Sequence, residues 1–103
     1  LAPVKLAILP LVKKDGLSEY AKKLYDELKI FFNTVYDEKD AIGRRYRRQD
    51  ALGTPVCVTI DHQSLEDDSV TIRFRDSMEQ MRINISKIKT KINDLVDMSN
   101  LLK

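Results

Sequence analysis

The sequence is poor in the residues that build disulfides and histidine-based sites. Its 103 residues include one cysteine, Cys57, and one histidine, His62. A lone cysteine excludes a disulfide within the chain and fits a reducing, cytoplasmic environment. A lone histidine leaves little material for a histidine-based metal site or a Ser-His-Asp catalytic site. No other catalytic machinery is recognisable, so we expect a chain without an active site of its own.

Long apolar runs and phosphate-binding loops are also absent. No apolar run approaches the about 20 residues needed to span a bilayer, and nothing resembles a signal peptide, so we expect no membrane contact. The three glycines, Gly16, Gly43 and Gly53, fit neither the GxGxxG nor the GxxxxGK-S/T spacing. The chain begins Leu-Ala-Pro without a methionine, which we interpret as a domain cut from a longer protein.

Composition and length are those of one folded domain. Hydrophobic residues make up 43% of the chain and charged residues 33%, which is ordinary for a soluble globular protein. The length is sufficient to bury a single core. No internal repeat, linker or low-complexity stretch divides the chain, so we expect residues 1–103 to form a single domain.

Hydrophobic periodicity predicts alternating strands and helices in the first half of the chain. Apolar runs at 4–12 and 55–61 indicate strands that are buried on both faces, and a shorter strand is predicted at 32–37. Apolar residues at every third or fourth position indicate a helix over 17–30. The stretch GRRYRRQDAL ends at a Gly-Thr-Pro stop signal and is predicted to form a second helix.

The second half of the chain changes its pattern. Residues 70–76 and 81–85 alternate between apolar and polar side chains on either side of the turn DSME, which predicts an antiparallel hairpin. Apolar residues recurring after Ser86 predict an amphipathic helix over 88–103. The predicted order is β-α-β-α-β-β-β-α. We therefore expect a three-layer α/β/α domain with a five-stranded mixed sheet, parallel in its first half.

Four arginines are concentrated on the second predicted helix. At about 100° per residue, the apolar side of this helix is formed by three residues: Ile42, Tyr46 and Leu52. Arg44, Arg47 and Arg48 share the opposite side. Arg45 lies at the boundary, beside Leu52. Charged helix faces are usually solvated surfaces, but those interleave both signs, whereas this face is almost entirely arginine. The guanidinium fork suits phosphates and stacks on bases, so we expect an anionic partner, most commonly nucleic acid.

The acidic residues after the third predicted strand divide into two groups. Asp61 stands directly at the end of that buried strand, where ligand sites of open α/β sheets tend to lie. Asp67 and Asp68 follow in a polar stretch that we interpret as a solvated loop. Cys57, within the strand, is predicted to be a small core residue.

Two stretches of the sequence, which together contain three separate blocks, resemble one known family. DEKDAIGRRYRRQDALGTPVCVTID, followed by VTIRFRDSMEQMRINIS, is similar to the C-terminal anticodon-binding domain of homodimeric glycyl-tRNA synthetases. The resemblance covers about residues 3–87, and the tail beyond Lys87 resembles nothing that we can place. Prolyl, threonyl and histidyl enzymes share this kind of domain, but these blocks resemble the glycyl branch specifically. Phe74 departs from the family, which usually has an acidic residue there.

The resemblance implies the class II anticodon-binding fold and contact with the anticodon stem-loop of tRNA. Arg44, Arg47 and Arg48 would lie on phosphates. The glycine anticodon ends in two cytosines, whose amino groups suit carboxylates and whose O2 and N3 atoms suit arginine. The candidate tRNA-binding residues are Arg44, Arg45, Arg47, Arg48, Asp61, Arg73, Arg75 and Asp76. The last four of these are expected at one edge of the sheet.

The resemblance also implies what this chain leaves to the rest of its parent enzyme. A glycine–tRNA ligase activates glycine with ATP and Mg²⁺ in a separate domain, whose class II motifs are absent here. We therefore expect a fragment that binds RNA without a cofactor and catalyses nothing. The family's dimer contacts are mostly made by the catalytic domain, so the parent is expected to be a cytoplasmic homodimer and the isolated domain a monomer.

Other functions remain open from the sequence. A small flavodoxin-like or receiver-like domain would need a phosphate loop, or acids after the first strand, and Leu9-Pro10-Leu11 supplies neither. A stand-alone or accessory protein could reuse the anticodon-binding fold to hold DNA or a protein partner. The anticodon-binding domain of a related prolyl, threonyl or histidyl synthetase is a further alternative.

Overall fold

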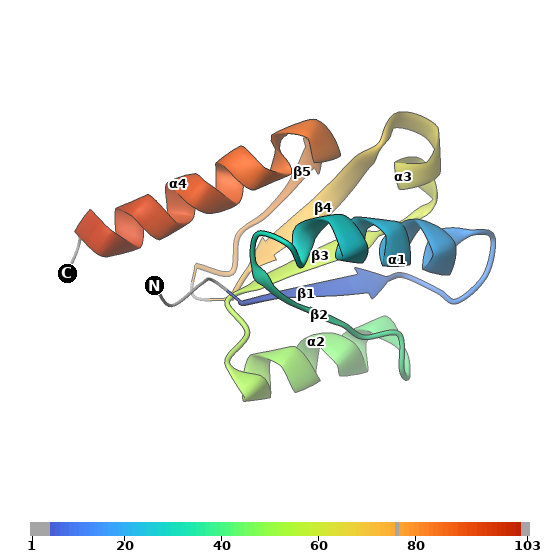
Figure 1. Cartoon of the computed structure of the whole chain (residues 1–103). Coiled ribbons are helices and arrows are strands. Elements are labelled where there is room, and N and C mark those ends of the chain that lie inside the picture. Colours follow the sequence, from blue (N-terminus) through green and yellow to red (C-terminus); the bar gives the residue numbers. More distant parts are fainter. Residues whose placement is uncertain (1–4, 76, 102–103) are drawn as a thin grey trace.

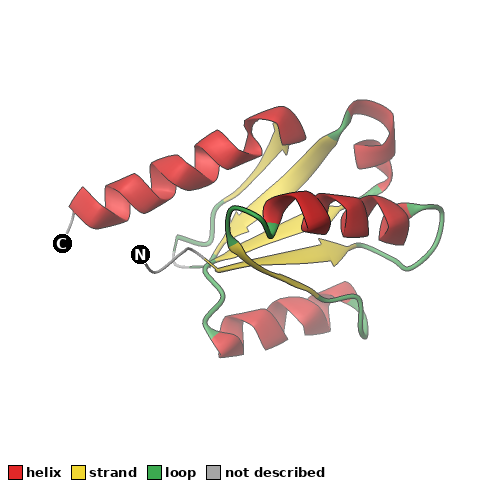
Figure 2. Cartoon of the chain, in the orientation of Figure 1, coloured by secondary structure: helices red, strands yellow, loops and turns green. Residues whose placement is uncertain are grey.

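The computed structural model describes residues 5–75 and 77–101, with side chains described up to residue 94. Within these ranges the chain forms five strands and four helices, joined mostly by short loops (Figure 1 and Figure 2). In chain order the elements are β1 (Lys5–Pro10), α1 (Leu17–Leu28), β2 (Asn33–Tyr36), α2 (Ile42–Leu52), β3 (Val56–Ile60), α3 (His62–Asp67), β4 (Ser69–Phe74), β5 (Gln80–Asn84), the 3₁₀ turn η1 (Ile85–Lys87) and α4 (Ile88–Leu101).

The five strands form one mixed sheet with the spatial order β2-β1-β3-β4-β5. β1 pairs in parallel with β2 on one side and with β3 on the other. β4 pairs antiparallel with both β3 and β5. The predicted combination of a parallel half and an antiparallel hairpin is therefore confirmed, with β2 and β5 as the two edges of the sheet.

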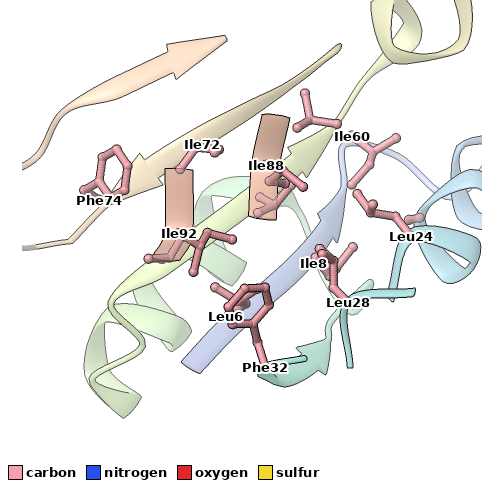
Figure 3. Packing of buried hydrophobic residues seen from close by; sticks show 14 of the residues in the cluster. Leu6, Ile8, Leu24, Leu28, Phe32, Ile60, Ile72, Phe74, Ile88 and Ile92 are labelled. Atoms are coloured by element: carbon pink, nitrogen blue, oxygen red, sulfur yellow. The ribbon is translucent and has the colours of Figure 1, made fainter. Parts of the chain in front are cut away.

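The larger hydrophobic core lies between one face of the sheet and the helices α1 and α4 (Figure 3). Leu6 and Ile8 of β1 are fully buried there, together with Leu24 of α1. Ile88 and Ile92 are one helical turn apart on α4, and both are buried in the same cluster. These contacts attach α4 to the sheet, as expected from the amphipathic pattern of the tail.

A smaller apolar cluster lies on the opposite face of the sheet, beneath α2. Ala7, Leu9 and Cys57 are buried in it, and Ile42 and Tyr46 of α2 pack against them. Successive side chains of a strand point to opposite faces, so β1 supplies both cores. Cys57 is thus a core residue, as predicted. Helices cover both faces of the sheet, which confirms the three-layer α/β/α architecture (Figure 1).

One helix was not predicted from the sequence. α3 occupies the segment before Asp68, where a solvated loop was expected. It begins with a capping box, in which the Asp61 carboxylate accepts from the Ser64 amide and the Ser64 hydroxyl accepts from the Asp61 amide. Six residues make fewer than two helical turns, which is too short for a hydrophobic period to be recognised. The predicted order therefore lacked one helix after β3.

The hairpin and the C-terminal helix that were predicted for this half of the chain are present where the structure describes it. The tail forms α4, although the side chains of Leu95 and Val96, and residue Leu102, lie outside the described part of the chain. Phe74 is 8% exposed and packs in the larger core, so an apolar side chain suits this position. Within the described ranges, no helix has both the length and the apolar composition that crossing a bilayer requires.

Candidate nucleic-acid interface

Six of the seven arginines of the chain lie on the α2 side of the sheet. Four of the seven are on α2 itself. Arg73 pairs with Cys57, which belongs to the cluster beneath α2, and therefore points to the same face. Arg82 of β5 pairs with Thr71 of β4, two residues before Arg73, and shares that face as well. Arg75 follows β4 directly. In contrast, α1 on the other face interleaves lysines with acids.

Part of this face is not covered by α2. The helix packs over β1 and β3, whereas the antiparallel hairpin extends beyond it (Figure 1). On the uncovered part the residues of β5 are exposed, and those of β4 are partly exposed. We call this surface the open face; it consists of Thr71, Arg73, Gln80, Arg82 and Asn84. Its side chains are polar throughout, and each can donate hydrogen bonds.

The helical projection placed Arg45 at the boundary between the two sides of α2. In the structure, Arg45 is buried. Its exposed fraction is 1%, whereas Leu52, expected in the apolar back of the helix, is 61% exposed. The Arg45 guanidinium donates hydrogen bonds to the carbonyl oxygens of Pro10, of Leu11 at 3.0 Å and of Asp37 at 3.2 Å. Burial lowers the pKa of Arg45, and the charge of nearby Asp37 opposes this effect. Arg45 therefore joins α2 to the ends of β1 and β2.

Arg48 is likewise not the free cation that was predicted. It donates two hydrogen bonds to the Asp37 carboxylate, at 2.7 and 2.8 Å, and a third to Asp40. Gln49 also donates to Asp37, at 3.2 Å. The hydrogen bonds to Asp37 raise the pKa of Arg48, so its charge is firmly held by two carboxylates. This arrangement stabilises the turn between β2 and α2.

Arg44 and Arg47 fit the prediction of an available cationic face. Both side chains are exposed on α2. Within the described part of the chain, neither forms a hydrogen bond or an ion pair, unlike Arg45 and Arg48 on the same helix. The unpaired positive charge of α2 thus comes from two arginines and not from three.

Arg73 is held in a fixed orientation at the border between α2 and the open face. Its two terminal nitrogens donate to the two carboxylate oxygens of Asp50, at 3.1 and 3.2 Å. The guanidinium lies over the ring of Tyr46, 4.8 Å from its centroid. The Tyr46 hydroxyl is in turn hydrogen-bonded to Thr59. The hydrogen bonds to Asp50 raise the pKa of Arg73.

Asp61 and Arg82 form a second carboxylate–guanidinium pair at the other end of this surface. One oxygen of Asp61 accepts from the amide and the hydroxyl of Ser64, both at 3.2 Å, and the other accepts from Arg82. Arg82 also donates to the Ser69 hydroxyl at 2.6 Å. Arg82 was not among the predicted site residues. Its place on the polar side of the alternating hairpin was the signal that could have identified it.

The predicted grouping of Asp61, Arg73, Arg75 and Asp76 at one edge is wrong for the residues that can be placed. Asp61 follows the C-terminal end of β3, whereas the Arg75 amide donates to Pro55, just before the N-terminal end of that strand. β4 runs antiparallel to β3, which carries Arg73 and Arg75 away from Asp61. Arg75 is exposed, and Asp76 lies outside the described residues.

Comparison with known families decides what kind of domain this is. A sequence model of the family described as "Anticodon binding domain" matches residues 5–95. The chain belongs to this family. The flavodoxin-like and receiver-like alternatives are thereby set aside, and the resemblance seen in the sequence is confirmed.

Several similar proteins carry one name. The anticodon-binding domain is 58% identical over 98 residues to a glycine–tRNA ligase of Treponema denticola, covering 91% of this chain and 22% of that protein. It is 60% identical to a glycine–tRNA ligase of Clostridium beijerinckii, covering 89% of this chain and 19% of that protein. The chain thus spans about a fifth of the length of these relatives, and the predicted likeness to the glycyl branch is confirmed.

Solved structures agree on the fold. The domain superposes on a prolyl-tRNA synthetase of Cryptosporidium parvum with a TM-score of 0.83 and 25% identity, covering 94% of this chain and 21% of that chain. It superposes on the RNA binding domain of a threonyl-tRNA synthetase of Cryptosporidium parvum with a TM-score of 0.78 and 22% identity, covering 90% of this chain and 23% of that chain.

Proposed function

We propose that this domain recognises the anticodon stem-loop of glycine tRNA as one part of a longer glycine–tRNA ligase. The observation that carries the proposal is the collection of arginines on one side of the sheet, next to a polar open face. The family membership and the names of its relatives support this choice of RNA. The candidate contacts are Arg44, Arg47, Arg73, Arg75 and Arg82, with Asp76 retained from the sequence.

The geometry supports two kinds of RNA contact on this surface, to phosphates and to bases. Arg44 and Arg47 are exposed and unpaired among the described residues, which suits contacts to phosphates along the RNA backbone. Arg73 is fixed by Asp50 and Tyr46, which suits a directed hydrogen bond to the edge of an unstacked base. Phosphate contacts would give affinity, and contacts on the open face would give sequence preference.

The attachment of glycine to tRNA is proposed to take place in another part of the parent enzyme. We propose that the catalytic domain of that enzyme binds ATP with Mg²⁺ and joins glycine to the tRNA. Among the described residues of this chain, no three His, Cys, Asp or Glu side chains are placed to hold a metal ion. We further propose a cytoplasmic homodimer as the parent, with the isolated domain monomeric because the dimer contacts belong to the catalytic part.

The proposed function is tested by binding to short RNA hairpins. The 103-residue chain is titrated with a hairpin that carries a glycine anticodon loop, and with the same hairpin in which both cytosines are replaced by uracil. We expect the glycine hairpin to bind about 10- to 100-fold more tightly, because uracil offers a donor at N3 where cytosine offers an acceptor. Equal affinity for the two hairpins, or no binding to either, would overturn the proposal.

A further inference from the structure

The open face contains two arginines that are each held by a carboxylate. Arg73 is paired with Asp50 and Arg82 with Asp61. In the register of the hairpin, Arg82 lies opposite Thr71, and Arg73 lies opposite Gln80. The two arginines are therefore diagonal neighbours on adjacent strands, with backbones about 7–8 Å apart. Of the two side chains, Arg82 is the more accessible, because it is 31% exposed whereas that of Arg73 is 12% exposed.

Asp61 has no oxygen left without a partner. Oδ1 accepts two hydrogen bonds from Ser64, and Oδ2 accepts from Arg82. Oδ2 has one further acceptor site, so a base amino group there would have to share that oxygen with the Arg82 guanidinium. Asp61 is therefore better suited to hold Arg82 in place than to read a base itself.

Arg82 is oriented before any ligand arrives. Asp61 and Ser69, which lie outside its own strand, hold the guanidinium in place. The Arg82 side chain is nevertheless 31% exposed. A free arginine loses side-chain freedom when it binds, and this lost freedom opposes binding. A preoriented fork avoids that cost, and its geometry matches only a base edge with acceptors in the right places.

We propose that Arg82 reads one of the two cytosines of the glycine anticodon, and that Asp61 is the positioning residue that orients it. This inference rests on the proposed function. Arg82 donates to the O2 and N3 acceptors of an unstacked cytosine. Arg82 thus carries the discrimination at one of the two cytosine positions.

The test uses three hairpins: the glycine anticodon hairpin and two variants, each with a single cytosine changed to uracil. The wild-type chain is expected to discriminate against each variant by about 10- to 100-fold. R82Q should lose the discrimination at one of the two positions and keep it at the other. R47Q, on α2, is the matched control: it removes the same charge but should weaken all three hairpins equally.

Variants of Arg82 and Asp61 distinguish a role in base recognition from a purely structural role. R82K keeps the cation beside Asp61 without the planar fork, and should lose the same discrimination as R82Q. D61N should reduce that discrimination in the wild-type background but add nothing to it in R82Q. A purely structural Asp61 would lower the melting temperature and leave the discrimination unchanged. Folding of every variant is checked by circular dichroism.

The outcomes distinguish the inference from the function on which it rests. A wild-type chain that does not discriminate at all overturns the proposed function, and the inference with it. A wild-type chain that discriminates at both positions, with R82Q or R82K folded and equally discriminating, overturns the inference alone. If R82Q does not fold, R82K decides. As a check without substitution, the Nε–H NMR signal of Arg82 should shift with the glycine hairpin and not with one of the variants. An identical response to all three hairpins would also overturn it.

Discussion

Arg45 and Pro10 are 35 residues apart in the sequence, and the buried guanidinium of one donates to the backbone carbonyl of the other. Pro10 is the last residue of β1, and the carbonyls of Leu11 and Asp37 accept from the same guanidinium. A single side chain thus supplies donors to three carbonyl groups near the ends of two parallel strands. The most arginine-rich stretch of the chain contains one residue whose role is to hold the fold together.

Replacing Arg45 with methionine should destabilise the domain strongly. The substitution leaves buried carbonyl oxygens without donors, and each such loss costs about 1–3 kcal/mol. We expect the free energy of unfolding in urea to fall by about 3 kcal/mol in total. R44M on the exposed side of the same helix should change it by less than about 0.5 kcal/mol. A change for R45M as small as that for R44M would contradict the role assigned to Arg45.

The salt dependence of RNA binding should depend on two arginines of α2 and not on three. Each phosphate contact contributes about 0.7 to the slope of log affinity against log salt for single-stranded RNA. R44Q/R47Q should therefore flatten the slope by about 1.4, whereas R48Q should leave it nearly unchanged because Asp37 and Asp40 already hold that charge. Titrations with the glycine hairpin at several salt concentrations measure this, and an equal change in slope for R48Q and R47Q would refute it.

Asp37 should account for part of the loss of stability in acid. Although burial opposes it, hydrogen bonds from Arg48, the Lys39 amide and Gln49 lower the pKa of Asp37 below its ordinary value of 3.8. A depressed folded-state pKa stabilises the fold above the unfolded value, and this stability is lost as the pH falls through the folded value. D37N should therefore flatten the decline of melting temperature below about pH 4. An unchanged acid profile in D37N would show that other carboxylates dominate.

Cys57 should be unreactive in the folded domain. Burial raises the pKa of its thiol from 9.0 to about 11, and the side chain is 2% exposed. Thiolate is the reactive form, so labelling with a disulfide reagent at neutral pH should proceed only through opening of the fold. The labelling rate should rise in R45M by the same factor as the equilibrium constant for unfolding, which is tenfold for each loss of about 1.4 kcal/mol. Rapid stoichiometric labelling of the native wild-type chain would contradict this placement.

The 103-residue chain should form no glycyl-tRNA when it is supplied with glycine, ATP and tRNA. The reason is that its sequence contains no phosphate-binding loop and no class II catalytic motif. Radiolabelled glycine incorporation by highly purified protein measures this directly. Charging above the background of a parallel preparation from empty cells would refute the prediction.

The sheet was predictable from the sequence because its patterns are long and regular. Alternation around Ile72 and Ile83 identified the hairpin, and the continuous apolar run through Ile8 identified a strand with a core on each face. α3 was not predicted because its first turn is defined by the capping pair Asp61 and Ser64, and not by the spacing of apolar residues.

The site was less predictable, because helical projection assigns side chains by angle and not by what they meet. Leu52 and Arg45 lie at similar angles on α2, yet Leu52 is exposed and Arg45 is buried. Arg45 is buried because the carbonyl groups at the ends of β1 and β2 need hydrogen-bond donors. No local sequence pattern reveals these carbonyl groups. The separation of Asp61 from Arg73 likewise depends on the antiparallel register of β4, which only the assembled sheet defines.

The one-sided placement of the arginines also affects how the domain approaches a polyanion. With a net charge of only +2, the molecule as a whole attracts nucleic acid weakly. Within a screening distance of about 8 Å at physiological ionic strength, however, the local field of α2 and the hairpin replaces the average. On the other face, α1 interleaves lysines with acids, so the charges of this helix largely cancel. We therefore expect the domain to turn its arginine-bearing face toward RNA at close range during diffusional encounters. At longer range, its attraction to unrelated RNA should stay weak.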